Sequence, residues 1–485
     1  MSAPAPARSP EETTARGREP AEPPELKGRI GLAGAVFALV GYIIGGSIFI
    51  LPGALAGQIG PAVFLSYLIA ASLALFVCFA AAQIGSAFPM SGGTYVAVSN
   101  VVSPFWGFMA VWMGVLIIFT STPALAYGLV DYVTPYFPVL AQHRLLGAVA
   151  SIAVFTGLNL LGIQTAVWAQ TVMVVVFMAV LLVVGVGGVA HSRPENFTPL
   201  FPLGIKPVLL AAIPAFYSYS GFSAIVALGG EVERPRRNIP LVLLISFPAI
   251  LVAYTLVTLA VPGVVPWPVL ARGNATLTRV AQDFLPPGVG TFVAVAAVCA
   301  IATTINGLVL SKSRDIFSLA VDRVLPGRLA GVGPFGEPRV ALLFMGAVAG
   351  AGVLMGRSFT EYASMSVLCV MVVHVLQGVV VLRLPKRRPE HFAAAGYRLG
   401  PAGRLFWGAG LIVCACGFIL AGLASDRIGA IVYLAACGLG ALWYAVRRLV
   451  LQRRGLRIDE LMLRHASHVV RPVAPGPAAT AASKA

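Results

Sequence analysis

The chain has 485 residues, of which 58% are apolar and 11% are charged, and its formal net charge is +16. Soluble domains average about 45–50% apolar and about 25% charged residues, so this composition excludes a soluble protein. The charged residues fall almost entirely between apolar stretches of about twenty residues, the length that spans the hydrocarbon core of a bilayer. The sequence therefore predicts an integral membrane protein.

Twelve apolar stretches are candidates for transmembrane helices. Only helices and closed barrels satisfy every backbone polar group in lipid, and runs this long and apolar are helices. The polar segment 1–28 lacks the pattern of a cleaved signal peptide, so the first stretch is expected to remain as a helix. In chain order the stretches cover residues 30–52, 62–84, 104–130, 145–165, 167–190, 207–230, 240–263, 289–311, 339–357, 362–383, 404–423 and 428–447.

The distribution of Lys and Arg predicts the orientation. With the N-terminus placed in the cytoplasm, 27 of the 34 basic residues fall in cytoplasmic segments and seven in outer loops. This asymmetry predicts a multi-pass protein of the cytoplasmic membrane with both termini inside. The tails 1–28 and 448–485 are then cytoplasmic, and their Ala-, Pro- and Ser-rich parts, 1–28 and 466–485, are predicted to be disordered.

The net positive charge is explained by this topology. A nucleic-acid partner would need a contiguous basic face, and the sequence shows none. The basic residues of 447–457 could touch anionic lipid headgroups, but the favoured explanation is that they simply flank a transmembrane helix. All six cysteines lie inside apolar stretches, which argues against a disulfide framework or a metal site, and no cofactor is expected.

Two adjacent glycines interrupt the first stretch. Gly45 and Gly46 lie in its middle and each costs roughly 1 kcal/mol in a helix relative to alanine, which predicts unwinding there. The alternative is close helix packing through Gly41-x-x-x-Gly45. Both interpretations remain open at this point.

The sixth stretch carries a polar aromatic run, Phe216–Ser223, in the middle of the membrane. If the first ten stretches form two five-helix repeats, the first and sixth occupy matching positions. Paired interruptions at matching places indicate a transporter site, and an odd repeat length inverts the second half. The predicted fold is a 5+5 inverted repeat, made of 29–190 and 207–383, followed by helices 11 and 12 in 404–447.

An interrupted helix exposes unpaired N–H groups at its new N-terminus and unpaired C=O groups at its new C-terminus. The N–H groups around Gly46, Ser47 and Ile48 suit a carboxylate. The C=O end near Tyr217 and Ser220 suits an ammonium group. A site with both ends would recognise the head group of an α-amino acid, so the predicted partner is an amino acid or a related amine.

Four stretches in order resemble the amino acid–polyamine–organocation (APC) family of permeases, over nearly all of residues 30–447. They are Gly41–Gly53, Phe88–Tyr95, Tyr219–Pro240 and Ser313–Pro326. The resemblance implies twelve transmembrane helices in the inverted-repeat fold, with helices 1 and 6 unwound. It also implies substrate contacts at Ile43, Gly45, Gly46 and Ser47 on helix 1, and at Tyr217, Ser218, Ser220 and Gly221 on helix 6.

The chain departs from the family pattern at several places. Gly45-Gly46-Ser47 stands where glycine–serine–glycine is common, and Ser223 stands where a glutamate often follows in helix 6. Residues 167–188 lack the lysine that some proton-coupled members carry in helix 5. These departures make a strongly cationic substrate less expected and leave the coupling ion open.

Some polar residues within or beside the membrane have two interpretations each. His374 could carry a proton or act as a neutral hydrogen-bond donor to a neighbouring helix. Thr303 and Thr304 could coordinate a cation or bond between helices. Six charged residues at the predicted cytoplasmic mouth could form gating ion pairs or remain solvated loop charges. They are Glu231, Glu233, Arg234, Arg314, Asp322 and Arg323.

The predicted function is secondary active transport by alternating access, as a permease or an exchanger, driven by protons or exchange rather than sodium. An integral membrane enzyme, such as a lipid or prenyl transferase, is the alternative from another class. Such an enzyme needs clustered carboxylates, whereas the 18 acidic residues are scattered. A non-transporting amino-acid sensor is a third possibility, and no soluble output domain supports it.

Overall fold

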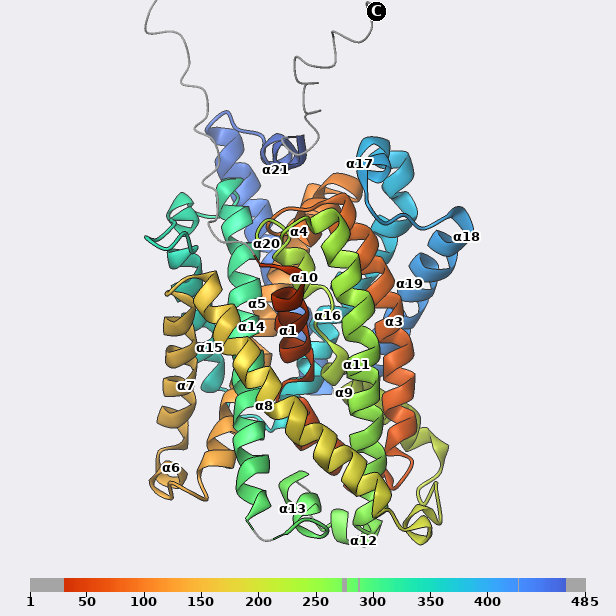
Figure 1. Ribbon diagram of the computed structural model, residues 1–485. Coiled ribbons are helices and arrows are strands. Elements are labelled where there is room, and N and C mark those ends of the chain that lie inside the picture. The colour runs from red at the N-terminus through yellow and green to blue at the C-terminus, as the bar shows by residue number, and fades with distance from the viewer. Residues whose placement is uncertain (1–29, 273–276, 287, 426, 468–485) are drawn as a thin grey trace, which may run out of the picture.

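The computed structural model describes residues 30–272, 277–286, 288–425 and 427–467. Within these ranges the chain is a bundle of helices and forms no strand beyond two isolated bridges (Figure 1). The predicted disordered tail 1–28 lies outside the described residues, as does 468–485. The all-α prediction is confirmed for the part described.

The helices of the first half, up to residue 227, are α1 (Leu32–Ile44), α2 (Ser47–Ile59), α3 (Val63–Ala87), α4 (Gly93–Val101), α5 (Pro104–Val133), α6 (Val139–Gln142), α7 (Arg144–Asn159), α8 (Ile163–Ala190), η2 (Pro194–Phe197), α9 (Ile205–Tyr219) and α10 (Ala224–Ala227). The helices of the second half are α11 (Pro235–Val264), α12 (Trp267–Leu270), α13 (Leu277–Gln282), α14 (Val289–Val321), η3 (Gly327–Ala330), α15 (Arg339–Val353), α16 (Phe359–Arg387), α17 (Pro389–Ala394), α18 (Pro401–Arg404), η4 (Leu405–Ala409), α19 (Gly410–Ser425), α20 (Arg427–Arg453) and α21 (Ile458–Ser467).

Ten helical segments among the described residues are long and apolar enough to cross a membrane. They match ten of the twelve predicted stretches. The other two, 145–165 and 339–357, correspond to α7 with 16 residues and α15 with 15 residues. Both fall short of the roughly 20 residues that a spanning helix needs. The first of them ends early because the chain turns at Gly162, where φ is +95°.

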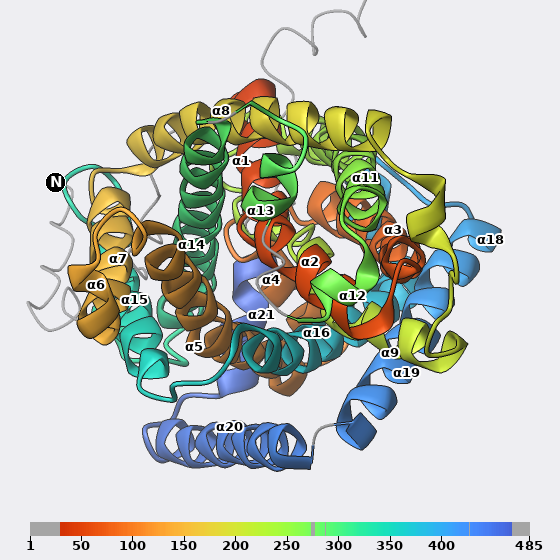
Figure 2. The same cartoon turned by 90° about the horizontal axis from the view of Figure 1, so that it is seen from below.

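The central helices are the first pair α1 and α2, together with α5 and α14. Seen from below, α1 and α2 lie inside a ring that includes α3, α5, α8, α11, α14 and α16 (Figure 2). In the spans of the α1–α2 pair, α5 and α14, 78% of the apolar window is buried, against 22% for the α18–α19 segment and 24% for α20. The last two spans are therefore peripheral, and the core forms around the broken first helix.

Both predicted interruptions are present. Helix α1 ends at Ile44 and α2 begins at Ser47, with Gly45 between them at φ +40° and ψ −157°. Helix α9 ends at Tyr219 and α10 begins at Ala224, with Gly221 at φ +150°. Unwinding of both helices is thus confirmed.

Close helix packing, the alternative explanation for the glycines of the first helix, applies at Gly41. A Cβ at Gly41 would collide with Val174 on α8 and would lie 3.2 Å from Gln170 Nε2. Glycine at 41 lets α1 approach α8 closely, whereas Gly45 belongs to the break itself. The two interpretations of this glycine pattern therefore apply to different residues.

The two ends of the bundle are named here by their helices. Helices α4, α17 and α21 lie at one end, the α21 end, and α6, α12 and α13 lie at the other, the α13 end (Figure 1). The predicted tail 448–485 begins as ordered helix: α20 continues to Arg453, and α21 packs on α4 and α5. Ile458 and Met462 are the buried residues that fix α21 there.

Candidate functional site

A cavity lies beside both helix breaks and contains about 720 Å³ of empty space, part of it open to solvent. The broken helices contribute one wall, and α5, α14 and α16 contribute the others. The described residues that line it are Tyr42, Ile43, Ser47, Ile117, Ser121, Leu125, Tyr217, Ser220, Gly221, Ser223, Ala224, Thr304, Leu308, Lys312, Ser366, Val370, Val373 and His374. This mixture of aliphatic, hydroxyl and basic side chains suits a small polar solute.

Five of the eight predicted contact residues line this cavity, namely Ile43, Ser47, Tyr217, Ser220 and Gly221. Ile43 and Ser47 flank the first break, and Tyr217, Ser220 and Gly221 lie at the second. The structure therefore brings the predicted faces of helices 1 and 6 together around one space.

The other three predicted residues face elsewhere. Ser218 directs its hydroxyl to Tyr67 Oη on α3, 3.2 Å away. A Cβ at Gly45 would collide with the Thr304 hydroxyl, and a Cβ at Gly46 would collide with Ile301. Glycine is needed at both positions because α14 packs directly against the break. The sequence argument placed the open face of Gly46 toward the substrate, whereas that face meets α14.

Tyr254 on α11 connects the two breaks. Its hydroxyl lies 2.6 Å from the Ser218 carbonyl oxygen, 3.0 Å from that of Ile43 and 3.2 Å from that of Ile44. A tyrosine hydroxyl has one proton, so these carbonyls share a single donor. Sequence reasoning did not single out Tyr254. The available signal was a tyrosine inside an apolar helix, where its hydroxyl needs a partner.

The carbonyl end of α9 is also partly satisfied by its own chain. The Tyr217 carbonyl oxygen accepts hydrogen bonds from the Ser220 backbone N–H at 3.1 Å and from the Ser220 hydroxyl at 2.7 Å. An ammonium group bound here would therefore share this oxygen with the Ser220 donors. The carbonyl end of α9 is therefore less available to a substrate than the sequence predicted.

The hydroxyl groups of α14 contact the last turn of α1. Thr303 donates to the Gly41 carbonyl at 2.9 Å, and the Thr304 hydroxyl lies 3.3 Å from the Tyr42 carbonyl. Both also lie near the Ala300 carbonyl of their own helix, at 2.7 and 3.4 Å. These contacts are the bonds between helices that one of the two interpretations predicts.

A second set of bonds between helices lies beside these threonines. Asn159 donates to the Asn306 side-chain oxygen, and Asn306 donates to that of Gln170, each at 2.7 Å. Gln170 in turn donates to the Ala38 carbonyl at 2.8 Å. This chain of amides connects α7, α14, α8 and α1, so polar side chains fix α1 along the face that α14 covers.

His374 is buried on α16 and lines the cavity. Its Nδ1 lies 2.9 Å from the Gln377 side-chain oxygen, and the Gln377 amide nitrogen donates to the Ser223 hydroxyl at 2.8 Å. Because an amide oxygen only accepts, Nδ1 carries the proton, and Nε2 of the neutral ring is an acceptor. Among the described residues Nε2 has no hydrogen-bond partner. Gln377 and Ser223 thus connect the histidine to the break of helix 6.

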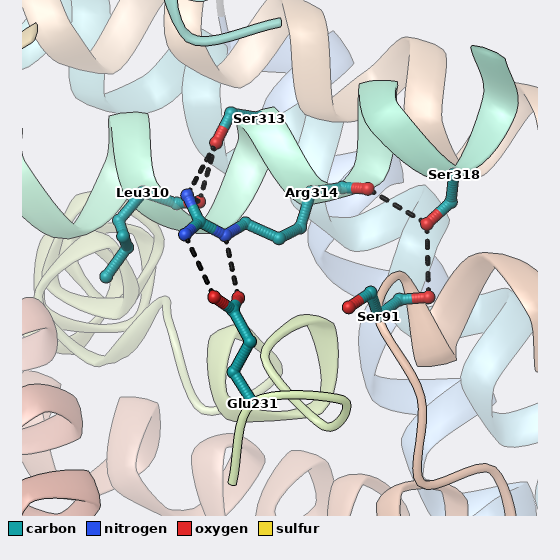
Figure 3. Close-up of polar contacts among 6 residues, drawn as sticks. All are labelled: Ser91, Glu231, Leu310, Ser313, Arg314 and Ser318. Atoms are coloured by element: carbon teal, nitrogen blue, oxygen red, sulfur yellow. Dashed lines mark hydrogen bonds and ion pairs between the residues drawn. The ribbon is translucent and has the colours of Figure 1, made fainter. Parts of the chain in front are cut away.

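A buried ion pair lies on the α21 side of the cavity (Figure 3). Arg314 Nε lies 2.9 Å from Glu231 Oε1, and Nη2 lies 3.2 Å from Oε2. The Arg314 Nη1 donates to the Leu310 carbonyl at 3.1 Å and to the Ser313 hydroxyl at 3.0 Å. The two charged side chains are 0% and 1% exposed. This pair fastens α14 to the loop that follows α10.

Two more segments join this cluster. The Ile30 N–H donates to the Glu231 carbonyl at 2.8 Å, and the Glu233 N–H donates to the Ile30 carbonyl at 3.0 Å. Ser318 donates to the Ser91 carbonyl at 3.1 Å, which connects α14 to the loop after α3 (Figure 3). Residues far apart in the sequence therefore close the α21 end together.

The remaining predicted mouth residues differ from the pair. Glu233, Arg234 and Arg323 are exposed, as solvated loop charges would be, whereas Glu231 and Arg314 form the pair. Asp322 is buried, and it accepts a hydrogen bond at 2.6 Å from the Tyr95 hydroxyl on α4, a partner that the sequence did not predict. It holds α4 against the end of α14.

The sequence profile of the amino acid permease family matches residues 30–425. The chain belongs to that family. This confirms the resemblance to APC permeases and indicates a transporter.

Individual relatives agree with this assignment. The permease is 32% identical over 440 residues to an uncharacterised transporter of Mycobacterium tuberculosis, covering 89% of this chain and 94% of that one. It is 25% identical to the methylthioribose transporter of Bacillus subtilis, over 72% of this chain and 80% of the relative. It is also 25% identical to the branched-chain amino acid permease BcaP of the same organism, over 75% and 82%.

The permease also has a vestibule at the α13 end, with about 1410 Å³ of empty space, part of it open to solvent. Asp131 and Arg144 line it and form an exposed ion pair at 2.7 Å. Phe359 lines the vestibule and Tyr217 lines the inner cavity, and their rings meet edge to face with centroids 5.9 Å apart. One aromatic contact therefore lies between the two spaces, whereas several hydrogen bonds close the α21 end.

Proposed function

We propose that this permease is a secondary active transporter of α-amino acids or related amines that works by alternating access across the cytoplasmic membrane. The observation that carries the proposal is the cavity between two interrupted helices at matching positions of the chain. Interrupted helices present backbone groups to a solute inside the membrane without a penalty for exposing them to lipid.

The proposed fold has twelve transmembrane helices arranged as two inverted repeats of five, with two peripheral helices. Helices α7 and α15 complete the count as short spans. The α21 end is cytoplasmic in this proposal, because 27 of the 34 basic residues belong to segments assigned to that side.

The substrate head group is proposed to bind between the breaks. The first N–H groups of α2, at Ser47 and Ile48, face a carboxylate with the favourable end of the helix dipole. The ammonium group lies toward Tyr217 and Ser220, whose oxygens border the same cavity. Ile43 and Gly221 form the wall between them.

Alternating access requires the closed end to open. In the geometry described, the Glu231–Arg314 pair and the Tyr95–Asp322 bond close the α21 end, and the Tyr217–Phe359 contact lies next to the outer vestibule. The proposed cycle separates the inner contacts while α1 and α9 tilt, and closes the vestibule at the same time.

Exchange or proton coupling is favoured over sodium coupling. The hydroxyls of Thr303 and Thr304 already contact the α1 carbonyls that a sodium ion would need. His374 is the proposed group for a proton, since its Nε2 is an available acceptor beside the cavity. Exchange of one amino acid for another needs no such group.

Reconstituted protein tests the proposal. Proteoliposomes loaded with unlabelled amino acids should take up labelled amino acids from outside, with sodium and pH gradients imposed separately. Methylthioribose serves as the comparison solute, because one relative bears the name of a transporter for it. Uptake of no amino acid under any gradient, with monodisperse protein, would contradict the proposal.

A further inference from the structure

The cavity has a second polar end, two helical turns from the break of helix 1. Thr304, Leu308 and Lys312 on α14 are spaced by four residues and all line the cavity, so they share one face of the helix. Thr304 touches the break, and Lys312 lies about 12 Å further along the helix axis. A solute whose head group binds at the break would direct its side chain toward this lysine.

Lys312 is held in place to face the cavity. Gly114 on α5 leaves room for the lysine stem: a Cβ there would lie 3.2 Å from Lys312 Cδ and 3.6 Å from Nζ. The side chain is 19% exposed, so it is largely shielded from water.

The ammonium group of Lys312 has donors to spare. Asp315, one turn further along α14, accepts one hydrogen bond from Nζ at 3.1 Å. A lysine ammonium has three N–H donors, so one intrahelical partner leaves two for a solute. A second acceptor oxygen beside Nζ would complete its hydrogen bonding.

The other groups on the cavity wall also suit hydrogen bonding. Lys312 is the one lysine or arginine among the described residues that line the cavity, and its ammonium is paired with the Asp315 carboxylate. Hydroxyls of Ser121 and Ser366, 2.8 Å apart, provide further hydrogen-bonding groups on the facing helices. Lys312 therefore offers N–H donors to a solute and not an uncompensated charge.

We infer that the permease selects amino acids whose side chain ends in an acceptor oxygen, a carboxylate or a carboxamide, and that Lys312 is the residue that recognises it. This inference rests on the proposed transport of amino acids. A cationic side chain has donors and no acceptor, so it cannot form this hydrogen bond with Lys312.

Competition experiments on proteoliposomes test the inference first in the unaltered permease. Uptake of labelled glutamate or glutamine is measured with glutamate, glutamine, leucine and lysine as competitors. We expect glutamate or glutamine to compete at least about tenfold better than lysine, a difference of about 1.4 kcal/mol in binding. If lysine competes as strongly as glutamate and glutamine do, the inference is overturned. If no amino acid is taken up at all, the proposed function itself is contradicted.

Two substitutions at Lys312 distinguish a carboxylate from a carboxamide as the group that the lysine recognises. Lys312→Met should remove most of the preference for glutamate and glutamine over leucine and leave leucine affinity unchanged. Lys312→Gln keeps a neutral donor, so it should retain glutamine and lose glutamate. The matched control is Lys386→Met, which removes an exposed lysine at the α21 end of α16. An unchanged preference in folded Lys312→Met protein would show that the lysine serves only its bond to Asp315.

Discussion

At the scale of single residues, the closed end of the permease depends on a charge pair that is fully removed from water. Attraction between the two side chains compensates for desolvation only while both charges and their hydrogen bonds are present. Arg314 has four hydrogen bonds, two of them to Glu231. Removing one member leaves the other charged and buried.

Glu231→Gln is therefore expected to destabilise the closed state by about 3–5 kcal/mol. Thermal unfolding of purified protein in detergent should show a clear drop in the melting temperature. The double variant Glu231→Gln with Arg314→Met should be less destabilised than the single one, since no lone charge remains. Glu233→Gln, at an exposed position of the same loop, is the control and should change stability by less than about 0.5 kcal/mol. A single variant as stable as this control would disprove the role of the pair.

At the scale of helical elements, the break between α1 and α2 is a packing feature as much as a binding feature. Gly45 adopts a backbone conformation that favours glycine, and Thr304 of α14 occupies the place of its missing side chain. Gly46 meets Ile301 in the same way. The start of α2 is thus positioned by α14.

Gly46→Val is expected to weaken substrate binding at least about tenfold while membrane insertion is retained. The added side chain collides with Ile301 and displaces the N–H groups at the start of α2. Binding to purified protein gives the affinity, and Ile301→Ala in the same chain should restore part of it. Gly157→Val is the control, because a Cβ at Gly157 on α7 meets no atom within 4 Å. Undiminished affinity in Gly46→Val would refute the placement of the head group.

At the scale of the whole molecule, the distribution of basic residues predicts which end of the bundle faces the cytoplasm. The orientation follows from charge alone and does not depend on the packing of the bundle. It can therefore be tested independently of transport.

Single cysteines introduced into a cysteine-free variant should show the orientation in intact cells. Arg193→Cys, exposed in the loop after α8, should react with an impermeant thiol reagent added outside. Arg454→Cys, just beyond α20, should react only after the membrane is permeabilised. Labelling of position 454 in sealed cells would reverse the proposed topology.

The apolar stretches were sufficient to predict where the long helices lie but not where each of them ends. Apolar length predicted all ten helical segments that are long enough to span, because the bilayer imposes that length on the sequence directly. The two shorter helices at predicted spans, α7 and α15, end where the chain turns near Gly162 and Gly356, both at positive φ. The apolar run 160–165 continues past the first of these turns, so hydropathy alone does not show where α7 ends.

The site was predicted where its chemistry is local and missed where it depends on contacts. Glycines and serines at the breaks carry their own signal, since they weaken a helix wherever they occur. Tyr254 carries only a general signal, a hydroxyl in an apolar helix that needs some partner, and Lys312 carries none, because it has the position of a basic residue beyond the end of a span. Their roles follow from which helices pack beside them.

The sequence by itself determined that this protein crosses a membrane, because that depends on composition. Short motifs added the resemblance to APC permeases, which implied that helices 1 and 6 are unwound. Only the tertiary structure decided between unwinding and close packing at each glycine of helix 1, which face of each break meets the cavity, which mouth charges form a pair, and that Lys312 lines the same space as Ser47. The physical reason is that lipid and backbone constraints act on every residue separately. Cavities and buried ion pairs exist only where distant segments exclude water from each other.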